Sequence, residues 1–404
     1  MSDRFDAVVV GASVAGCTAT HILARAGARV ALVERRPDPD AYKVTCTHAI
    51  LSSGSPTISR LGLDRVLEAR GAVRVHGDGW TPFGGWIRAP DDAPRGWGVT
   101  RWTLDPLLRR RAAETPGLEL LLGHTATGLV SGTAGRPAGV EVEARDRGRR
   151  SLRAPLVVAA DGRHAPLARM AGGRGRLRPN NRFAYWAYWR GVPPTDRARV
   201  WFLDPDGAAH FPNEDGVTLL AAVGHRSRLP EFRDDLEGAY LRHISALPDG
   251  PVLDGAERIS KVIGAIDYDQ NLIRPAARPG IAFVGDAALA ADPLFGVGLG
   301  WALQSGEWLA DAVAPALLGD GDLDVALSRY ARRFLRRLAP HHVVISDFSS
   351  GRPVTGPERM MSRAAAGNEC VARALEQIFS RRRSPMRLLD PRLVPHIARG
   401  LVSG

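Results

Sequence analysis

The segment that most constrains the fold is VVVGASVAGCTATHILARAGARVALVERR, residues 8–36. A short β-branched run ends at Gly11, apolar residues at helical spacing continue to Ala26, and a second apolar run ends at Glu34. This order predicts a buried parallel strand, a glycine turn, a helix and a second parallel strand. A βαβ unit of this kind is typical of dinucleotide-binding folds.

Each position of the glycine turn has a physical role. Gly11 permits the tight turn, and Gly16 allows the helix to pack closely on the strand. Ser13 replaces the usual middle glycine, and its hydroxyl can donate to a phosphate at the helix N-terminus. Glu34 follows Gly16 by 18 residues, near the spacing of the acid that binds a ribose hydroxyl. Because its charge repels a 2′-phosphate, we expect FAD or NAD rather than NADP here.

A second strand, turn and helix are predicted within residues 279–313. The segments GDAA (285–288), DP (292–293) and GVGLG (296–300) resemble the second FAD motif of flavoprotein monooxygenases. The resemblance implies that Asp286 binds the ribityl chain and that the loop containing Pro293 flanks the isoalloxazine. It also implies that the following helix points its N-terminus at the flavin pyrimidine edge, where the helix dipole stabilises negative charge.

Three further segments extend this resemblance to roughly residues 5–315. RWTLDPLL, from Arg101, is similar to a family segment whose arginine reaches the FAD phosphates or ribose, and Asp161 lies in a middle Asp-Gly motif. Ala165 stands where that motif usually has serine. Residues 43–72 resemble a bacterial subgroup of geranylgeranyl-reductase-like FAD oxidoreductases. The resemblance implies FAD as the resident cofactor and NADH or NADPH as an external reductant.

Several side chains are candidates for the site that these motifs predict. His48 is the first catalytic candidate, because it lies beside the expected isoalloxazine and an ordinary imidazole pKa suits proton transfer. His210 is a second candidate on a presumed pocket strand; both histidines could instead be structural. Cys46 could contact flavin or substrate, or be a packed thiol. The residues expected to bind FAD are Gly11, Ser13, Ala15, Gly16, Glu34, Arg35, Lys43, Arg101, Asp161, Gly285, Asp286, Pro293, Gly296, Gly298 and Leu299.

The predicted fold is α/β, with a discontinuous Rossmann-like FAD-binding domain at residues 1–75, 101–180 and 273–330. Residues 76–100 and 181–272 are expected to form an inserted antiparallel β-sheet substrate domain, and residues 331–404 a C-terminal helical segment. Six of the nine tryptophans fall in the insertions, among short β-rich runs. One face of such a sheet can line an aromatic pocket over the flavin, although these rings could also be ordinary core.

The composition limits the other possibilities. No apolar run is long enough for a membrane span, and the three cysteines are too scattered for a disulfide framework or a metal site. The polar first residues are unlike a signal peptide, so we expect a cytoplasmic protein. The net charge of +11 comes without a nucleic-acid-binding motif. It is interpreted as a solvated surface, which could also attract an acidic carrier protein, a reductase or anionic lipid.

The motifs favour an FAD-dependent hydroxylase or epoxidase that uses O2 on an apolar, aromatic or polyketide-like small molecule. An FAD-dependent reductase of an isoprenoid-like alkene is the first alternative, since the segment KVTC (43–46) partly matches its signature, without the usual proline and glycine neighbours. A flavin halogenase is suggested by DPLFGVG (292–298), but the W-x-W-x-I-P motif of such enzymes is missing from the sequence. A cyclase that uses FAD only as a scaffold is the fourth hypothesis.

Overall fold

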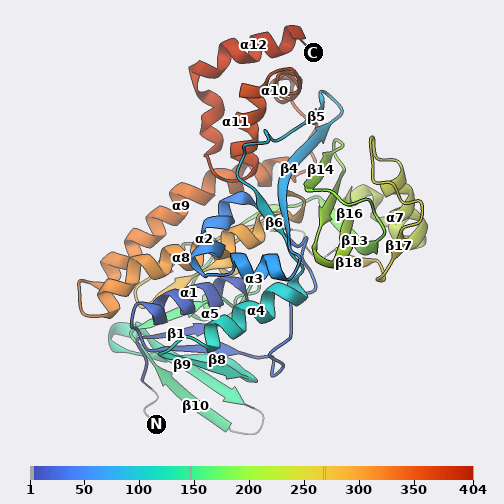
Figure 1. The fold of residues 1–404 in the computed structure, drawn as a ribbon. Coiled ribbons are helices and arrows are strands. Elements are labelled where there is room, and N and C mark those ends of the chain that lie inside the picture. The colour runs from blue at the N-terminus through green and yellow to red at the C-terminus, as the bar shows by residue number, and fades with distance from the viewer. Residues whose placement is uncertain (1–3, 145–147, 267, 269, 404) are drawn as a thin grey trace.

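A six-stranded sheet forms the base of the molecule, which is described here by a computed structural model for residues 4–144, 148–266, 268 and 270–403 (Figure 1). Neighbouring strands are parallel except for the pair at one edge, β20 with β21. In spatial order the strands are β20 (Ala277–Arg278), β21 (Ile281–Phe283), β11 (Leu156–Ala159), β1 (Ala7–Val10), β2 (Val30–Glu34) and β7 (Leu118–Leu122).

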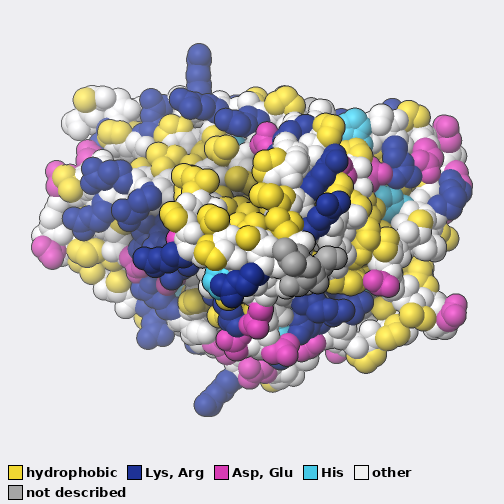
Figure 2. All heavy atoms as spheres, turned by 90° about the horizontal axis from the view of Figure 1, so that it is seen from above, with side chains coloured by type: hydrophobic (Ala, Val, Ile, Leu, Met, Phe, Trp, Pro, Cys, Tyr) yellow, Lys and Arg dark blue, Asp and Glu magenta, His cyan; other side chains and the backbone are white. Residues whose placement is uncertain are grey.

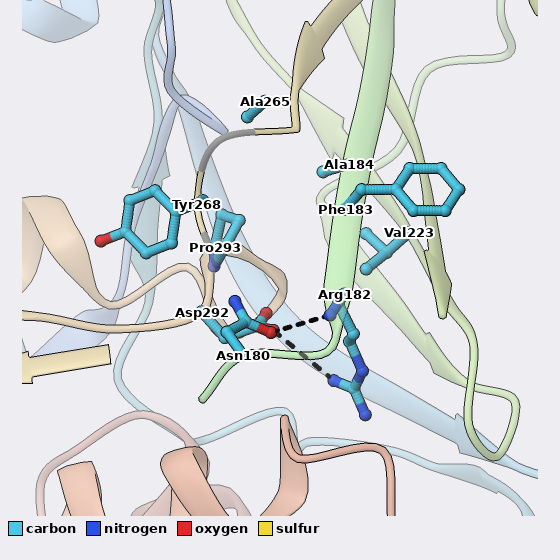
Figure 3. A pocket seen from close by; sticks show the side chains of 9 residues that line it. All are labelled: Asn180, Arg182, Phe183, Ala184, Val223, Ala265, Tyr268, Asp292 and Pro293. Carbon is cyan, nitrogen blue, oxygen red and sulfur yellow. Dashed lines mark hydrogen bonds and ion pairs between the residues drawn. The ribbon is translucent and has the colours of Figure 1, made fainter. Parts of the chain in front are cut away.

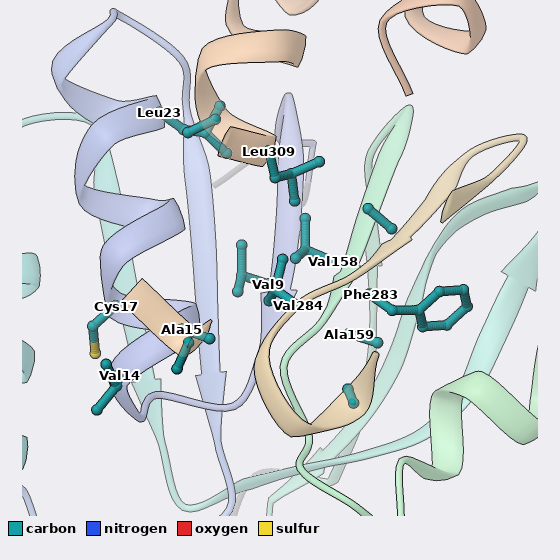
Figure 4. Close-up of a cluster of buried hydrophobic side chains, with 14 of the residues drawn as sticks. Val9, Val14, Ala15, Cys17, Leu23, Val158, Ala159, Phe283, Val284 and Leu309 are labelled. Carbon is teal, nitrogen blue, oxygen red and sulfur yellow. The ribbon is translucent and has the colours of Figure 1, made fainter. Parts of the chain in front are cut away.

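Helices cover one face of this sheet, and a three-stranded antiparallel sheet lies against the other (Figure 1). Small residues let α1 and α8 pack closely: a Cβ on Gly306 would lie 2.6 Å from the Ala15 carbonyl oxygen. The resulting core of hydrophobic side chains, most of them from α1, β1, β11, β21 and α8, is shown in Figure 4. The elements are α1 (Val14–Arg25), α4 (Arg101–Ala113), α5 (Pro166–Met170), α8 (Gly298–Leu317), β8 (His124–Ser131), β9 (Pro137–Ala144) and β10 (Gly148–Arg153).

A ten-stranded sheet, called here the large sheet, stands over the base. It runs in the order β17 (Glu257–Arg258), β13 (Arg182–Arg190), β16 (Thr218–His225), β15 (Gly207–Pro212), β14 (Arg197–Phe202), β4 (Val73–Thr81), β6 (Gly96–Gly98) and β3 (Ala49–Ile50), with β18 (Ile263–Ala265) on β13 and β5 (Gly85–Ile87) on β4. The α/β fold class is thereby confirmed. The large sheet also contains β3 and the start of β4, which come from the first predicted FAD-binding segment and not from the predicted insertions. The division into domains therefore stays a prediction.

The two faces of β13 pack against different parts of the molecule, because side chains alternate along a strand. Tyr185 and Trp189 pack with α6 (Leu229–Asp234) and α7 (Leu236–Ser245). Trp186 and Tyr188 lie on the other face, in a cluster with Leu294. This second face is called the loop-side face, since it packs on the loop formed by residues 292–298.

The C-terminal helices lie at the far end of the large sheet (Figure 1). Ile87 of β5 packs among Ala364, Val371 and Leu375, which come from α10 and α11. Among the described residues, no helix is both long and apolar enough to cross a membrane. The remaining elements are α2 (Ser55–Arg60), α3 (Asp64–Ala69), α9 (Leu323–Phe348), α10 (Gly356–Gly367), α11 (Glu369–Phe379), α12 (Val394–Ser403) and a small sheet of β12 (Arg176–Pro179), β19 (Gln270–Ile273) and β22 (Leu289–Ala290).

Candidate active site

The predicted FAD motifs meet at one edge of the parallel sheet. Strands β1, β2, β11 and β21 run in the same direction, so the residues that follow them lie together at their carboxyl ends. These residues are Gly11, Glu34, Asp161 and Gly285. The carboxyl edge of a parallel sheet is the place where such folds bind their ligands.

The glycine turn is closed so tightly that it excludes side chains. A Cβ on Gly11, whose φ is +108°, would lie 2.3 Å from the Ala160 carbonyl oxygen, and a Cβ on Gly16 would lie 1.9 Å from that of Gly11. Ser13 is the N-cap of α1 but its side chain makes no capping bond. The first N–H groups of α1 therefore remain available to an anion at the helix N-terminus.

Charged side chains surround this turn. Arg101 donates through Nη2 to Ser13 Oγ at 2.8 Å, and Asp105 accepts from Arg101 Nε and Nη2 at 2.7 and 2.8 Å. This i,i+4 ion pair is buried and bidentate, which fixes the arginine beside the turn. Glu34 Oε2 accepts from the Ala12 N–H at 2.9 Å, so the acid also braces the turn. Asp105 was not among the predicted site residues, although it stands in the same motif as Arg101.

The second motif touches the first. Lys43 Nζ donates to Asp286 Oδ2 at 2.8 Å, while the Lys43 backbone N–H donates to Asp105 Oδ2 at 3.0 Å. A Cβ on Gly285 would lie 2.9 Å from that of Ala15, so helix α1 and the second turn are in direct contact. The structure thus brings the first and second motifs and Lys43 into one place.

The loop of residues 292–298 connects this edge to the large sheet, as Figure 3 shows. Asp292 and Arg182 are both buried, and Asp292 Oδ2 lies 3.9 Å from Arg182 Nη1. Burial raises the pKa of Asp292 and lowers that of Arg182, and each group moderates the effect on the other. Pro293 follows, Gly296 has a φ of +60°, and α8 begins at Gly298. Arg182 was not predicted as a site residue because nothing in its local sequence distinguishes it.

His48 is fully buried between the carboxyl edge and the loop-side face. Its Nδ1 accepts from the Arg101 backbone N–H at 2.7 Å, and its Nε2 lies 2.7 Å from Tyr188 Oη. Desolvation, aided by the Arg101 charge, lowers the pKa of His48 to about 3. Since a backbone N–H can only donate, Nδ1 carries no proton, and the neutral ring donates from Nε2 to Tyr188. The expectation of a histidine with an ordinary pKa is therefore wrong, because burial disfavours the charged form.

Tyr188, like Asp105 and Arg182, is a residue that the sequence prediction missed. Burial raises its pKa to about 12, so it remains a protonated phenol. Because His48 supplies the hydrogen bond between them, the Tyr188 hydroxyl proton can be donated elsewhere. The Trp102 ring packs against Tyr188 and His48, with centroids 5.0 and 5.5 Å away. The signal in the sequence was the alternation of large rings in FAYWAYW, which could not show which set faces the loop.

His210 does not belong to this site. Along β15, Phe211 lies on the loop-side face, whereas His210 pairs with Leu220, whose side chain packs on the α6 and α7 face. Burial and the Arg199 charge lower the pKa of His210 to about 4. The prediction that His210 lines the pocket is corrected, because strand alternation points it to the opposite face.

Four other candidates have distinct surroundings. Asp161 Oδ2 accepts from the Leu167 N–H at 3.0 Å, while its buried Oδ1 has no partner among the described residues. Cys46 Sγ accepts weakly from the His48 N–H at 3.4 Å, which makes it part of the His48 turn. Arg35 is exposed. Leu299 is buried at the start of α8.

These features fit FAD as the resident cofactor. The turn at Gly11 and Gly16 has no room for a Cβ, so the backbone can approach a pyrophosphate closely. Uncapped N–H groups, Arg101 and Lys43 supply positive charge for its phosphates, while Glu34 and Asp286 supply acceptors for sugar and ribityl hydroxyls. The loop of residues 292–298 and the N-terminus of α8 would flank the ring system.

Comparisons with known proteins agree with this fit. The family model described as FAD binding domain matches residues 4–204. Digeranylgeranylglycerophospholipid reductase 2 of Methanopyrus kandleri is 30% identical over 345 residues, which cover 82% of each chain. Menaquinone reductase of Mycobacterium tuberculosis is 27% identical over 389 residues, 90% of this chain and 89% of that one.

A solved structure matches the fold across its whole length. The myxobacterial chondrochloren halogenase superposes with a TM-score of 0.74 at 20% sequence identity, covering 100% of this chain and 98% of that one. At this identity the match concerns the fold alone. The fold, the cofactor motifs and the two relatives therefore point to one group of flavoproteins.

Proposed function

The chain belongs to the FAD-dependent oxidoreductases that share this FAD-binding domain, and from that premise we propose that it is a monooxygenase of an apolar, aromatic or polyketide-like small molecule. One oxygen atom of O2 would enter the substrate and the other would leave as water. NADH or NADPH would supply the two electrons and, with a proton from solvent, the hydrogens of that water. Bound FAD supplies the redox chemistry, and the protein orients the reactants and excludes water.

The observation that carries this proposal is the chemistry of the loop-side face. Trp186, Tyr188 and Phe211 present large buried rings opposite the loop of residues 292–298. Tyr188 has a hydroxyl proton to donate, because His48 supplies the hydrogen bond between these two side chains. Aromatic walls with a neutral donor suit a flat substrate that carries hydroxyl or carbonyl oxygens.

The side chains of this face have separable roles in the proposed reaction. The neutral His48 ring holds the Tyr188 phenol in place, and Tyr188 donates a hydrogen bond to a substrate oxygen. His48 cannot act as an acid near neutral pH, because its pKa is about 3. Arg101 links the two halves of the site, since its backbone N–H bonds His48 and its guanidinium bonds Ser13.

The proposal is tested by following oxygen in the purified, FAD-loaded protein. With NADH or NADPH and a panel of hydroxylated aromatic and polyketide-like compounds, we expect substrate-dependent O2 uptake. Under ¹⁸O₂ the product mass should increase by one ¹⁸O atom. Uptake that releases only hydrogen peroxide, with no labelled product from any compound, would contradict a monooxygenase.

A reductase of an isoprenoid-like alkene is the second candidate, and it is favoured by the two relatives, which are named as reductases. In that reaction two hydrogens would add across a carbon–carbon double bond, and O2 would not be consumed. Anaerobic saturation of a prenyl chain, with deuterium from solvent or from labelled NADH or NADPH in the product, would select it.

The halogenase and scaffold hypotheses make different predictions. A halogenase would need chloride or bromide as well as O2 and would give a halogenated product. A scaffold cyclase would convert its substrate with no net use of NADH, NADPH or O2. An acidic carrier protein that presents the substrate, or a separate reductase, stays a proposal based on the basic surface.

A further inference from the structure

The C-terminal region exposes apolar side chains that a folded protein normally buries. Met386, Leu389 and Val394 are 62%, 72% and 62% exposed, and all three lie within nine residues of one another. Met386 and Leu389 stand on one short turn, residues 385–389, and Val394 is the first residue of α12. With Arg383 and Arg392 they form what is called here the C-terminal patch.

The same patch is positively charged. Arg383 and Arg392 are exposed, and neither guanidinium makes an ion pair with any residue that the structure describes. Between residues 356 and 401 the chain has nine arginines and four acidic residues. Arg387, which lies between Arg383 and Arg392 in the sequence, is paired with Asp390. The patch therefore combines a free positive charge with a large apolar area.

Figure 2 shows the face of the molecule on which the C-terminal helices lie. Hydrophobic side chains gather in the middle of this face, and Arg and Lys side chains stand beside them. An apolar surface bordered by arginines matches the region where lipid headgroups meet acyl chains, because apolar side chains insert while arginines contact phosphates.

Aromatic contacts connect this end of the molecule to the candidate active site. Phe379, at the end of α11, is partly exposed and stacks on Phe202 of β14, with ring centroids 5.8 Å apart. Phe202 in turn packs on Phe295, in the loop of residues 292–298, at 5.7 Å. A row of packed aromatic rings thus connects the C-terminal helices to the loop beside the predicted flavin position.

We propose that the C-terminal patch docks the protein on the surface of a membrane that contains anionic lipids. Met386, Leu389 and Val394 would insert at the level of the headgroups, and Arg383 and Arg392 would bind lipid phosphates. The binding is peripheral, and it would bring this row of packed aromatic rings close to the lipid phase. This inference does not depend on which reaction the flavin performs.

An acidic protein partner could also be attracted by the arginines, but the geometry favours a lipid surface. The most exposed apolar side chains stand on short turns, and a helix-in-groove partner requires a concave apolar surface. Isolated side chains at turn tips insert readily into a fluid interface.

The test is co-sedimentation of the FAD-loaded protein with vesicles. We expect binding to vesicles of phosphatidylcholine and phosphatidylglycerol, and at least about 10-fold weaker binding to phosphatidylcholine alone. The double variant Met386→Glu/Leu389→Glu should bind anionic vesicles at least about 10-fold more weakly. The matched control Leu177→Glu/Val252→Glu changes two side chains of similar exposure elsewhere and should bind like the wild type.

A second variant separates charge from insertion. Arg383→Ala/Arg392→Ala should lose the preference for anionic vesicles by about 10-fold and weaken the dependence on salt. Flavin absorbance confirms that each variant is folded. Failure of the wild type to sediment with anionic vesicles, equal binding by the patch and control variants, or binding to an acidic carrier protein without vesicle binding would each overturn the proposal.

Discussion

The carboxyl edge of the parallel sheet and the loop-side face of the large sheet adjoin at His48 and differ in chemistry. The edge is charged: Arg101 pairs with Asp105, Lys43 pairs with Asp286, and Glu34 braces the turn. The face is aromatic, and His48 between the two is kept neutral by burial. The contrast indicates that an anionic cofactor is held by charge and backbone N–H groups. The loop-side face instead offers a neutral hydrogen-bond donor, the Tyr188 hydroxyl.

The difference also shows in what each region tolerates. The edge depends on the close approach of backbones, so a single methyl group at Gly16 would collide with the Gly11 carbonyl oxygen. The face depends on which side of a strand a ring occupies, so changes there can alter chemistry while leaving FAD in place. Variants on the two sides should therefore have separable effects on flavin content and turnover.

The largest effect is expected from Gly16→Ala. The added Cβ would lie 1.9 Å from a backbone oxygen, so helix α1 must shift away from the turn. We expect purified protein nearly free of flavin and destabilised by about 1–3 kcal/mol, measured by absorbance and urea unfolding. Gly77→Ala, in open space on β4, is the control and should keep FAD and stability. Full flavin content in Gly16→Ala would show that the turn does not hold the pyrophosphate.

The next largest effect should come from Tyr188→Phe, which removes the donor of the loop-side face but keeps its ring. Turnover should fall about 100-fold, the size of losing one preorganised donor, with flavin content unchanged. Tyr185→Phe changes the neighbouring tyrosine on the opposite face and should keep full turnover.

His48→Asn probes the same contact from its other end. Asparagine tolerates the left-handed backbone at this position, where φ is +57°, but it cannot reach Tyr188 as histidine does. A fall in turnover with FAD retained is expected. Wild-type rates in both His48→Asn and Tyr188→Phe would remove this pair from the active site.

Local motifs made the cofactor half predictable from sequence. Gly11 and Asp286 follow strands, Glu34 ends one and Gly16 lies in the first turn of the helix after Gly11, and the carboxyl ends of parallel strands must meet at one edge. The structure places them there together. The motifs named Lys43 and Asp286 as separate FAD-binding candidates, and the structure adds the contact between them, 243 residues apart in the sequence.

The substrate half could be predicted only as a sheet rich in aromatic residues. His210 and Phe211 are neighbours, and one step of strand register decides which of them faces the loop. That register is set by pairing with β14 and β16, which the local sequence does not reveal. The pKa of His48 likewise depends on burial by distant segments, so an ordinary value was the natural but wrong expectation.

A smaller effect is expected in the pH dependence of stability. An unfolded histidine gains a proton below a pKa of about 6.5, whereas His48 stays neutral in the fold down to about pH 3. Its contribution is therefore fully present above pH 6.5 and is lost as the pH falls toward 3. At pH 5 the stability lost in this way is about 2 kcal/mol.

The measurement is urea unfolding at pH 7.5 and pH 5.0 with saturating FAD. Wild-type protein should lose about 2 kcal/mol more than His48→Asn between these pH values. Buried histidines such as His21 and His341 are common to both proteins, so their contributions cancel. Equal losses would mean that His48 is protonated in the folded state.

The smallest expected effect is on FAD affinity, and it compares the Lys43–Asp286 pair of the carboxyl edge with an ordinary surface ion pair. Asp286→Ala removes the acceptor for the ribityl chain and leaves Lys43 without its partner, so FAD should bind about 10-fold more weakly, by fluorescence titration. Glu34→Ala should act in the same direction through the ribose. Asp40→Ala breaks the exposed pair with Arg110, which is worth little in solvent, and should leave affinity unchanged. If Asp286→Ala binds FAD as tightly as Asp40→Ala, the Lys43–Asp286 pair is only a surface contact. Lys43 and Asp286 would then not contribute to FAD binding. The carboxyl edge would differ from the loop-side face only through Arg101 and the glycine turn.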